Sequence, residues 1–483
     1  MTISLNPPFG SLSNATEPGR HVSASRRAVV IGAGMGGLVA ARVLANHFQE
    51  VIVIERDRLP PIGENRKGVP QGQHVHGLLA QGCATLESLF PGLLDNFAEH
   101  GANVDDAMGA IRWHQSGGYH APGLLGVRAV SASRPLLEGV VRDRLLQIPG
   151  IEIRQETSVE SLVWDTPGER VSGVRLSGTG ASGDGVLMAA LVVDAAGRGS
   201  RLPAWLHDAG LDRPMETSVG IGIRYASRIF RREQGHMGGK HITVIVSNPK
   251  VPRGGLVCGI EGDRWLVTLA GRRGIQPPVD IDGFLDFTKS FEAPDIHDLV
   301  RQAEPLDEGA TYGFPRSLRR HYDALDRFPA GIIPIADAIC GFNPIYGQGM
   351  TVVALEAQEL DRCLADGTED LAARYFASIS PLVDGAWKLA TSGDMRFLVP
   401  ADALPRKVRA ITWYMDRLHV AARHDPEVAM AFSKVVHLLE PPASLLTPEM
   451  AARVAKGNIR LGMQRRSTPQ ALNPAHPAPT PAR

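Results

Sequence analysis

Cysteine, unbalanced charge and long apolar runs are all scarce in this chain. Its four cysteines lie far apart without any C-x-x-C pair, which excludes the spacing of a structural zinc site or a disulfide framework and fits a reducing compartment. Lys plus Arg and Asp plus Glu each number 51, without a long basic run, so neither nucleic acid nor an anionic membrane is indicated as a partner. No apolar run reaches the length of a transmembrane segment.

The ends of the chain lack the patterns of targeting or folded segments. Residues 1–25 have neither the basic start nor the apolar centre of a signal peptide, and they are predicted to be a disordered lead. Residues 466–483 are rich in proline and alanine and are predicted to be a disordered tail. We therefore expect a soluble, cytoplasmic protein. Its length of 483 residues predicts two or three domains.

A dinucleotide-binding pattern is present near the N-terminus. Residues 28–31 form a short apolar run typical of a buried parallel strand, and Gly32-Ala33-Gly34-Met35-Gly36-Gly37 follows with the pattern G-x-G-x-x-G. Helical apolar spacing continues over 38–44, and a second apolar run, 51–54, ends in Glu55. A glycine-rich turn in an ordinary β-α-β unit is the alternative, but this order of elements favours a Rossmann-like site.

Each residue of this pattern has a physical role in such a site. Gly32 makes the tight turn, Gly34 lets the backbone approach a pyrophosphate, and Gly37 lets the helix pack on the strand. The N–H groups of the first helical turn stabilise phosphate charge. Glu55 accepts hydrogen bonds from an adenosine ribose.

Two later segments indicate that the dinucleotide is FAD. Asp194 ends an apolar strand and begins Asp-Ala-Ala-Gly-Arg-Gly-Ser, while Asp337 follows a third strand and precedes the turn and helix over 343–351. Asp337 accepts hydrogen bonds from ribityl hydroxyls. The helix that begins near Gly347 directs its N–H groups toward the negative charge of a reduced flavin. Gly347 and Gly349 let the backbone approach the ring.

These three blocks, GAGMGG…E, DAAGRGS and IADAICGFNPIYGQGMT, resemble those of the p-hydroxybenzoate-hydroxylase-like FAD-dependent monooxygenases, in the same order. The segments GVPQGQHVHGLL and NPIYGQGMT look most like the polyketide and terpenoid epoxidases related to squalene epoxidase. The resemblance covers about residues 26–460. It implies an α/β fold with a Rossmann-like FAD-binding domain, an antiparallel-sheet substrate domain and a helical C-terminal region.

The resemblance and the strand and helix pattern predict the domain boundaries. The FAD-binding domain comprises residues 26–100, 129–215 and 316–385, and the substrate domain comprises 101–128 and 216–315. The C-terminal helices occupy 386–465.

The resemblance also implies the cofactor-binding residues. Arg134 lies near the phosphates or the ribitol, Val159 contacts adenine through its backbone, Asp337 binds the ribitol, and Asp194 and Gly197 contact both flavin and nicotinamide. The ADP moiety is bound by Gly32, Gly34, Met35, Gly36, Gly37, Glu55 and Arg56. The ring is bound by Pro344, Gly347, Gly349 and Met350.

The reaction implied by the resemblance is transfer of one oxygen atom from O2, through a flavin C4a-hydroperoxide, to a hydrophobic secondary metabolite such as a polyketide or terpenoid. Electrons come from NAD(P)H, bound directly or through a separate flavin reductase, and both sources stay open. No catalytic side chain is assigned, because the flavin performs the chemistry.

The chain departs from the family pattern at two places. Ala336 stands where a glycine usually precedes the acid, and Cys340 stands where phenol hydroxylases have histidine. No residue is an obvious base for deprotonating a phenol, so epoxidation is favoured over aromatic hydroxylation.

His74 and His76 flank Val75 and point to the same side of an extended segment. A metal would need a third ligand, and no cluster supplies one, so no metal site is predicted. A polar pair that lines the flavin pocket and ordinary loop hydrogen bonds both remain interpretations.

Two other flavoenzyme classes stay open. One is an alkene reductase resembling geranylgeranyl reductases, although their aromatic motif has no good counterpart at residues 265–268. The other is a flavin halogenase, although the motif W-x-W-x-I-P is absent. The oxygenase is the prediction.

Overall fold

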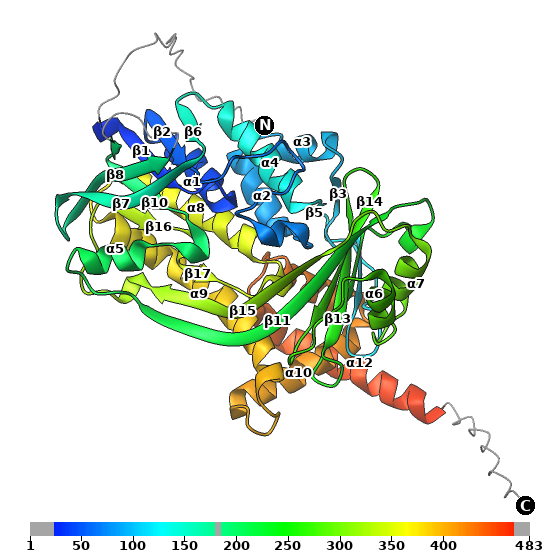
Figure 1. Ribbon diagram of the computed structural model, residues 1–483. Helices are drawn as coiled ribbons and strands as arrows, with labels where there is room; N and C mark the ends of the chain where they lie inside the picture. The colour runs from blue at the N-terminus through cyan, green and yellow to red at the C-terminus, as the bar shows by residue number, and fades with distance from the viewer. Residues whose placement is uncertain (1–23, 179–184, 468–483) are drawn as a thin grey trace, which may run out of the picture.

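The computed structural model describes residues 24–178 and 185–467 (Figure 1). Most of the two segments predicted to be disordered, 1–25 and 466–483, lies outside the described residues. Their inner ends belong to elements: Ala24–Arg26 forms a 3-10 helix, and the last helix, α12, extends to Ser467.

A five-stranded parallel sheet, sheet A, organises the first half of the molecule. The N-terminal apolar run forms its central strand, because all side chains of residues 28–31 are buried on both faces. The strand order is β16-β10-β1-β2-β6. Its members are β1 (Arg27–Ile31), β2 (Glu50–Ile54), β6 (Ile151–Arg154), β10 (Leu191–Asp194) and β16 (Ile332–Pro334).

Helices cover sheet A and form the largest apolar core with it. The helix after the glycine turn, α1, is buried along almost its whole length and packs on α8 and α4. Helix α2 packs on α8, and α3 packs on α4 (Figure 1). The bounds of these helices are α1 (Met35–Leu44), α2 (Ala80–Leu89), α3 (Leu93–Glu99), α4 (Arg134–Leu146), α5 (Leu202–Asp208) and α8 (Gly349–Ala365).

A seven-stranded sheet, sheet C, forms the second part, in the order β17-β15-β11-β14-β13-β12-β4. Its pairs are antiparallel, as predicted, except that the edge strand β4 runs parallel to β12. Its strands are β4 (Ile111–His114), β11 (Met215–Arg231), β12 (Ile242–Ile245), β13 (Arg253–Ile260), β14 (Arg264–Gly271), β15 (Ala310–His321) and β17 (Cys340–Gly341).

The two faces of sheet C have different coverings. One face packs on α6 (Ile281–Thr288) and α7 (Asp295–Gln302) around Phe230, Trp265 and Phe284. The other face carries a smaller apolar cluster that includes Ile223, Tyr225 and Phe314. Tyr225 on this face reaches the turn before α8, so this face looks toward the part built on sheet A.

Long strands join the two parts. β11 and β15 of sheet C pair over most of their length, and one end of this pair runs beneath the part built on sheet A (Figure 1). β15 runs without a break across the predicted domain boundary at 315/316. Two small sheets complete the strands: β3 (Asn103–Asp106) with β5 (Arg128–Ser131), and β7 (Thr157–Thr166), β8 (Arg170–Gly178) and β9 (Val186–Met188).

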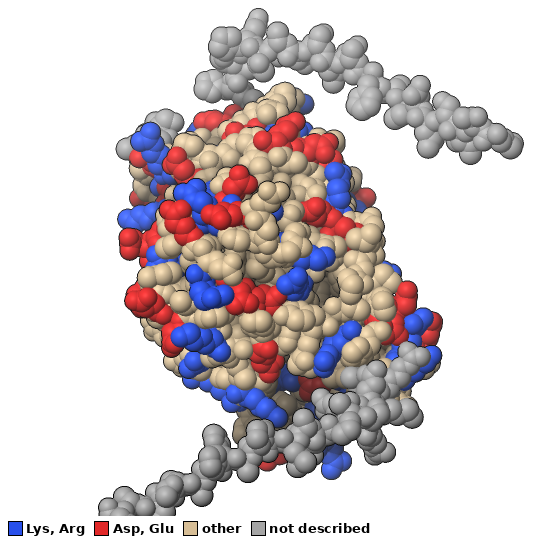
Figure 2. All heavy atoms as spheres, turned by 90° about the vertical axis from the view of Figure 1, so that its right-hand side faces the viewer, with Lys and Arg blue, Asp and Glu red and all other residues tan. Residues whose placement is uncertain are grey.

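The C-terminal region is helical, as predicted. α9 (Leu371–Leu398) packs on α8 and links the two parts, while α10 (Arg406–Ala422), α11 (Pro426–Val436) and α12 (Pro448–Ser467) enclose a core of their own. Among the described residues, no helix is both long and apolar enough to cross a membrane. Figure 2 shows one face on which basic and acidic side chains are interspersed, in agreement with the balanced charge.

Candidate functional site

Three turns that are far apart in the sequence meet at the carboxyl end of sheet A. They follow β1, β10 and β16, and these strands are neighbours in the sheet. Gly32, after β1, has φ +99°, and a Cβ on it would lie 2.8 Å from the carbonyl oxygen of Ala195, after β10. A Cβ on Gly36 would lie 2.9 Å from the Cβ of Ala336, after β16. The turns therefore converge where open α/β sheets bind ligands.

Gly37 allows helix α1 to pack directly over the first turn. A Cβ on this residue would lie 1.8 Å from the carbonyl oxygen of Gly32 and 3.3 Å from Val30. No side chain fits at such a distance, so only glycine is compatible with this approach of helix and strand. The N-terminal N–H groups of α1 then face the space in front of β1, where they favour negative charge.

Other glycines of these turns face open space. Within the described parts of the chain, no atom lies within 4 Å of the place where a Cβ would stand on Gly199 or Gly349. A Cβ on Gly34 would have only the Arg66 side chain within 4 Å. Gly347 adopts φ +65°, a conformation that favours glycine. A long flat ligand can approach this backbone without meeting side chains. The turns therefore fit the diphosphate and ring of FAD.

Further predicted cofactor residues border the same space. Pro344 is exposed at the start of a 3-10 helix (Pro344–Tyr346). Gly197 has φ +69°, and a Cβ on it would lie 3.9 Å from the Cβ of Asp337. Met35 and Met350 stand in the first turns of α1 and α8, where both are buried in the shared core.

Two predicted residues stand at the far end, next to Glu55. The N–H group of Thr157 donates to the Glu55 carbonyl oxygen at 3.0 Å, so β7, which carries Val159, begins next to Glu55. Arg56 extends into solvent, with a side chain that is 70% exposed. Adenine contact by Val159 and contact of Arg56 with the ADP moiety stay predictions.

Glu55 is held by a buried charge network. Its carboxylate accepts hydrogen bonds from the N–H groups of Ala33 at 2.8 Å and Asp57 at 3.0 Å, and it pairs with Arg66 at 2.8 Å. Arg66 also pairs with Glu138 at 2.9 Å. Burial alone would raise the pKa of Glu55, but Arg66 and the two N–H donors outweigh burial and lower it. Glu55 is therefore an ionised acceptor that is fixed in place.

Arg134 joins the same network from α4. Its guanidinium donates to the second Glu138 oxygen, at 3.2 and 3.3 Å. Glu138 is thus shared between Arg66 and Arg134, and both cations stand beside the turns. Two arginines at this position suit a diphosphate, because each guanidinium supplies several N–H donors.

Asp194 organises its own loop. The side chain has no accessible surface, and its oxygens accept hydrogen bonds from the Ala196 N–H at 3.0 Å and from the Ser200 hydroxyl. Burial raises the pKa of this carboxyl. The surface of the loop that a ligand can reach is therefore the backbone around Gly197, and flavin or nicotinamide contact by Asp194 itself stays a prediction.

The turn after β16 explains the departure at Ala336. This residue has φ +61°, a conformation that favours glycine, and its N–H group donates to the buried carboxyl group of Glu356 at 2.7 Å. The Ala336 Cβ fits because Gly36 opposite has none. The turn leaves the next side chain, Asp337, exposed among the converging loops, which suits its predicted contact with ribityl hydroxyls.

The histidine pair lies between the glycine turns and sheet C. His74 is 5% exposed, its Nδ1 lies 2.7 Å from the Ser227 hydroxyl, and its ring centroid is 5.5 Å from that of Tyr312. Burial lowers the pKa of His74 to about 4, so the ring is neutral at pH 7. His76 is half-buried, with Nδ1 at 2.9 Å from the His74 carbonyl oxygen. Among the described residues, no group of three or more His, Cys, Asp or Glu could hold a metal.

Comparison with known proteins decides the family. No protein-family model matches the chain. The chain is 35% identical to protein Rv3254 of Mycobacterium tuberculosis over 459 residues, which cover 92% of this chain and 96% of Rv3254. The chain belongs to the Rv3254 family. It is also 27% identical over 395 residues to a kynurenine 3-monooxygenase of Salinispora arenicola, with 76% of this chain and 79% of that protein covered.

Solved structures show the fold of this Rv3254-family member. PqsL of Pseudomonas aeruginosa, described as a probable FAD-dependent monooxygenase, superposes with a TM-score of 0.58 at 21% identity, covering 77% of this chain and 98% of PqsL. The flavin-dependent brominase Bmp2 superposes with a TM-score of 0.63 at 14% identity, covering 91% of this chain and 99% of Bmp2. The predicted fold class is confirmed, and the epoxidase branch stays a prediction.

The structure adds residues to the site that motif reading missed. Arg66 binds Glu55 and Glu138, Glu356 holds the turn before Asp337, and Asp394 contacts the turn before α8. Arg66 lies eleven residues after Glu55, and Glu356 lies five residues after Thr351, but nothing in their spacing indicates a partner. Asp394 lies in a helix about fifty residues beyond the turn and carries no sequence signal at all.

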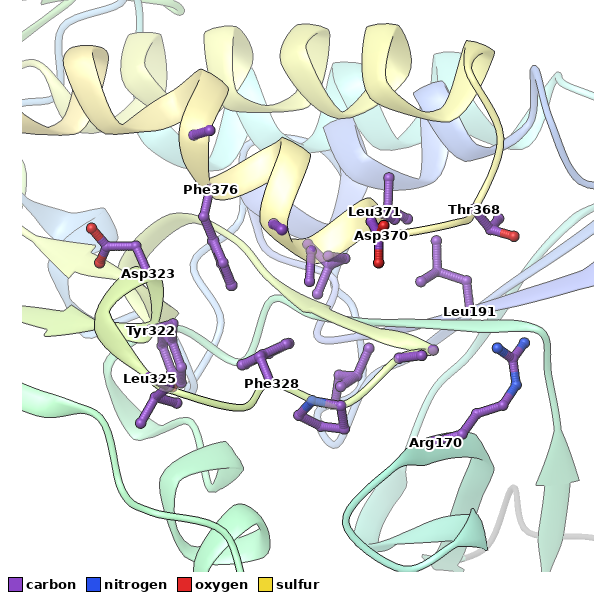
Figure 3. Close-up of a pocket in the computed structure, with 18 of the residues that line it drawn as sticks. Arg170, Leu191, Tyr322, Asp323, Leu325, Phe328, Thr368, Asp370, Leu371 and Phe376 are labelled. Carbon is purple, nitrogen blue, oxygen red and sulfur yellow. The ribbon is translucent and has the colours of Figure 1, made fainter.

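A cavity of about 520 Å³ lies elsewhere, between β10, β16 and the start of α9 (Figure 3). Leu191 and Ile332, which line it, are the first residues of β10 and β16. The cavity therefore stands at the amino ends of these strands, whereas Asp194 and Asp337 follow their carboxyl ends. Ligands of open α/β sheets bind at the carboxyl ends, so this cavity is not the predicted flavin site.

Proposed function

We propose that this Rv3254-family member is an FAD-dependent monooxygenase that transfers one oxygen atom from O2 to a hydrophobic secondary metabolite. The observation that carries the proposal is the meeting of three turns whose open glycine backbone, helix N-termini and exposed Asp337 suit a flavin dinucleotide. The monooxygenase reaction is supported by the similarity of the chain to a kynurenine 3-monooxygenase and to PqsL, which is described as a probable FAD-dependent monooxygenase.

In this proposal, bound FAD supplies the redox chemistry that activates O2. The chain's own residues bind and orient. Arg66 and Arg134 donate hydrogen bonds to the diphosphate, Glu55 accepts from the ribose, and Asp337 accepts from the ribityl chain. The N-terminus of α8, with Gly347 and Gly349 beside it, stabilises negative charge on the ring.

The substrate site in this proposal is the face of sheet C that carries Ile223, Tyr225 and Phe314. These side chains form an apolar cluster, and Tyr225 contacts Asn343 of the turn before α8. An apolar wall keeps water from the reaction and suits a hydrophobic polyketide or terpenoid. Epoxidation is the favoured reaction, with hydroxylation as the second form. Burial lowers the pKa of His74, so its ring is a weak base, and neither this ring nor the hydroxyl of Ser227 beside it suits the deprotonation of a phenol.

Electron supply and location are part of the proposal. NAD(P)H reduces the flavin directly or through a flavin reductase, and the protein acts in the cytoplasm. An oxidation of NADPH by the purified, FAD-loaded protein alone would support the direct route. Oxidation that requires an added reductase would support the second route.

The proposal is tested by rapid mixing. Anaerobically reduced, FAD-loaded protein is mixed with oxygenated buffer while the flavin spectrum is followed. A transient flavin species that differs from both the reduced and the oxidised form is expected, and transfer of labelled oxygen from O2 to an apolar alkene would establish a monooxygenase. Direct reoxidation without such a species, even with apolar ligands present, would contradict the proposal and favour the alkene reductase.

A flavin halogenase is the second candidate, because Bmp2 shares the fold over 91% of this chain. Bromide added to the same reaction discriminates the two. A brominated product that appears only with bromide would favour the halogenase, while an oxygenated product that is independent of bromide would favour the monooxygenase.

A further inference from the structure

The turn that precedes α8 is held by a buried carboxylate from a distant helix. Asp394 lies on α9 and has no accessible surface. One of its oxygens, Oδ1, accepts hydrogen bonds from the Asn343 side-chain amide at 2.9 Å and from the Tyr346 hydroxyl at 3.1 Å. Both donors belong to Asn343-Pro344-Ile345-Tyr346-Gly347, the turn predicted to face the flavin ring. Both of these hydrogen bonds between the helix and the turn therefore use the same oxygen atom.

The same oxygen binds a cation from sheet C. Arg272, the residue after β14, donates from Nη1 to Asp394 Oδ1 at 2.9 Å, and its side chain is only 4% exposed. Its guanidinium also lies 4.2 Å from the centre of the Phe397 ring, one helical turn from Asp394. Arg272 thus compensates the buried charge of Asp394 and holds it against α9. Sheet C, α9 and the turn meet at this point.

Asn343 passes the constraint on to the backbone. Its side-chain oxygen accepts hydrogen bonds from the Ile345 N–H at 3.2 Å and from the Tyr225 hydroxyl at 3.3 Å. The amide group is therefore oriented by donors on one side and by Asp394 on the other. Gly393 makes room for the second contact, because a Cβ on it would lie 2.2 Å from the Tyr346 hydroxyl.

We propose that Asp394 is a positioning residue for the flavin-facing turn, and that its Oδ1 acceptor, rather than its charge alone, holds Asn343 and Tyr346. The predicted effect on flavin binding rests on the proposed function, whereas the predicted effect on the turn itself does not. The inference goes beyond that function because it assigns the geometry of the ring site to a C-terminal helix. In an apolar interior, an acceptor shared by three donors specifies one arrangement of all three.

Two paired variants separate the acceptor from the charge. Asp394→Leu with Arg272→Met removes the acceptor and also the cation that would otherwise remain unpaired. Asp394→Asn with Arg272→Met removes the same two charges but keeps an oxygen for Asn343 and Tyr346. Asp416→Asn is the matched control. Asp416 lies on α10 and pairs with Arg396, which stands two residues after Asp394 on α9, so this substitution removes an ion pair of the same helix without changing the turn.

The first readout does not depend on FAD. Amide hydrogen exchange of Ile345, Tyr346 and Gly347 is measured in the FAD-free chain at a temperature where each variant is folded. We expect these amides to exchange at least about tenfold faster in the Leu–Met variant than in the wild type. In the Asn–Met variant and in Asp416→Asn, they should exchange at the wild-type rate. This measurement stands even if the proposed function fails.

The second readout is the bound flavin. The Kd for FAD, measured by titration, is expected to rise at least about tenfold in the Leu–Met variant, with a loss of vibronic structure in the flavin absorption band. The Asn–Met variant restores both. Wild-type exchange and affinity in the Leu–Met variant would overturn the inference. Equal losses in the Leu–Met and Asn–Met variants at matched Tm would also overturn it, because the oxygen would then be irrelevant.

Discussion

The two ends of the predicted flavin site are built by different means. At the ADP end, the decisive contacts join residues of one β-α-β unit, such as the close approach of Gly37 to Gly32 and the hydrogen bond from Ala33 to Glu55. At the ring end, Asp394 of α9 accepts a hydrogen bond from Asn343 in the turn. Asp394 is in turn bound by Arg272, which follows β14.

This difference predicts how each end responds to change. The ADP end depends on backbone positions where no side chain fits, so adding one Cβ atom at such a position would disrupt the packing of the β-α-β unit. The ring end depends on polar side chains that are buried together, so its geometry depends on charge, protonation and the packing of distant helices.

Gly37→Ala is expected to have the largest effect. Its Cβ would lie 1.8 Å from the Gly32 carbonyl oxygen, so α1 must separate from β1, at a cost of more than about 4 kcal/mol. We expect a loss of cooperative thermal unfolding and of FAD binding. Gly349→Ala is the control, because its Cβ meets no described atom within 4 Å: the Tm should be kept while FAD affinity falls. A Gly37→Ala protein with wild-type Tm would contradict the close packing.

Arg66→Met tests the charge network of the ADP end. It leaves the buried carboxylates of Glu55 and Glu138 without a shared partner, which costs about 3 kcal/mol in the free energy of unfolding. Urea unfolding measures this loss. Arg154→Met, which breaks a more exposed pair with Glu152, should cost less than about 1 kcal/mol. If the two variants lose the same stability, the network does not support this end.

Glu356→Gln tests the protonation of the Glu356 carboxyl, which holds the turn before Asp337. Burial raises the pKa of Glu356 to about 8, from 4.5 in the unfolded chain. The folded state therefore binds the proton more tightly, so its contribution to stability is complete below about pH 4.5 and is lost as pH rises toward 8. Glutamine does not titrate but keeps an acceptor for the Ala336 N–H group.

We therefore expect the stability of Glu356→Gln to fall less between pH 5 and pH 9 than that of the wild type, by about 2–4 kcal/mol. Tm measured across this range checks the difference. Glu359→Gln, on the same helix but paired with Arg362, should follow the wild-type pH profile. Parallel profiles of wild type and Glu356→Gln would show that the carboxyl is not buried as described.

Ala336→Gly is expected to have the smallest effect, and to stabilise the protein. The φ of +61° is strained for alanine but not for glycine, so the gain should be about 0.5–1 kcal/mol after the greater freedom of glycine in the unfolded chain is counted. Thermal unfolding measures it. Ala338→Gly, in the same turn but without positive φ, should destabilise. A loss of stability in Ala336→Gly would mean that its Cβ contact with Gly36 outweighs the strain.

The sequence alone was sufficient to predict the first β-α-β unit and the fold class. The G-x-G-x-x-G turn, the acid at Glu55 and the two later blocks lie at strand ends, where a few neighbouring residues decide the local structure. The resemblance carried by these blocks was also enough to predict the antiparallel sheet and the C-terminal helices. It did not reveal that β15 continues across the predicted boundary at 315/316, because pairing with β11 determines the length of that strand.

Tertiary structure alone decided the rest. The contact of Ala336 with Gly36, the network of Arg66, and the hydrogen bonds of Asp394 join residues that are tens to hundreds of positions apart. A buried charge or polar group shows no periodicity, and its meaning depends on which partner the fold brings to it. The same holds for His74, whose burial against sheet C, and not its sequence neighbours, makes its ring neutral.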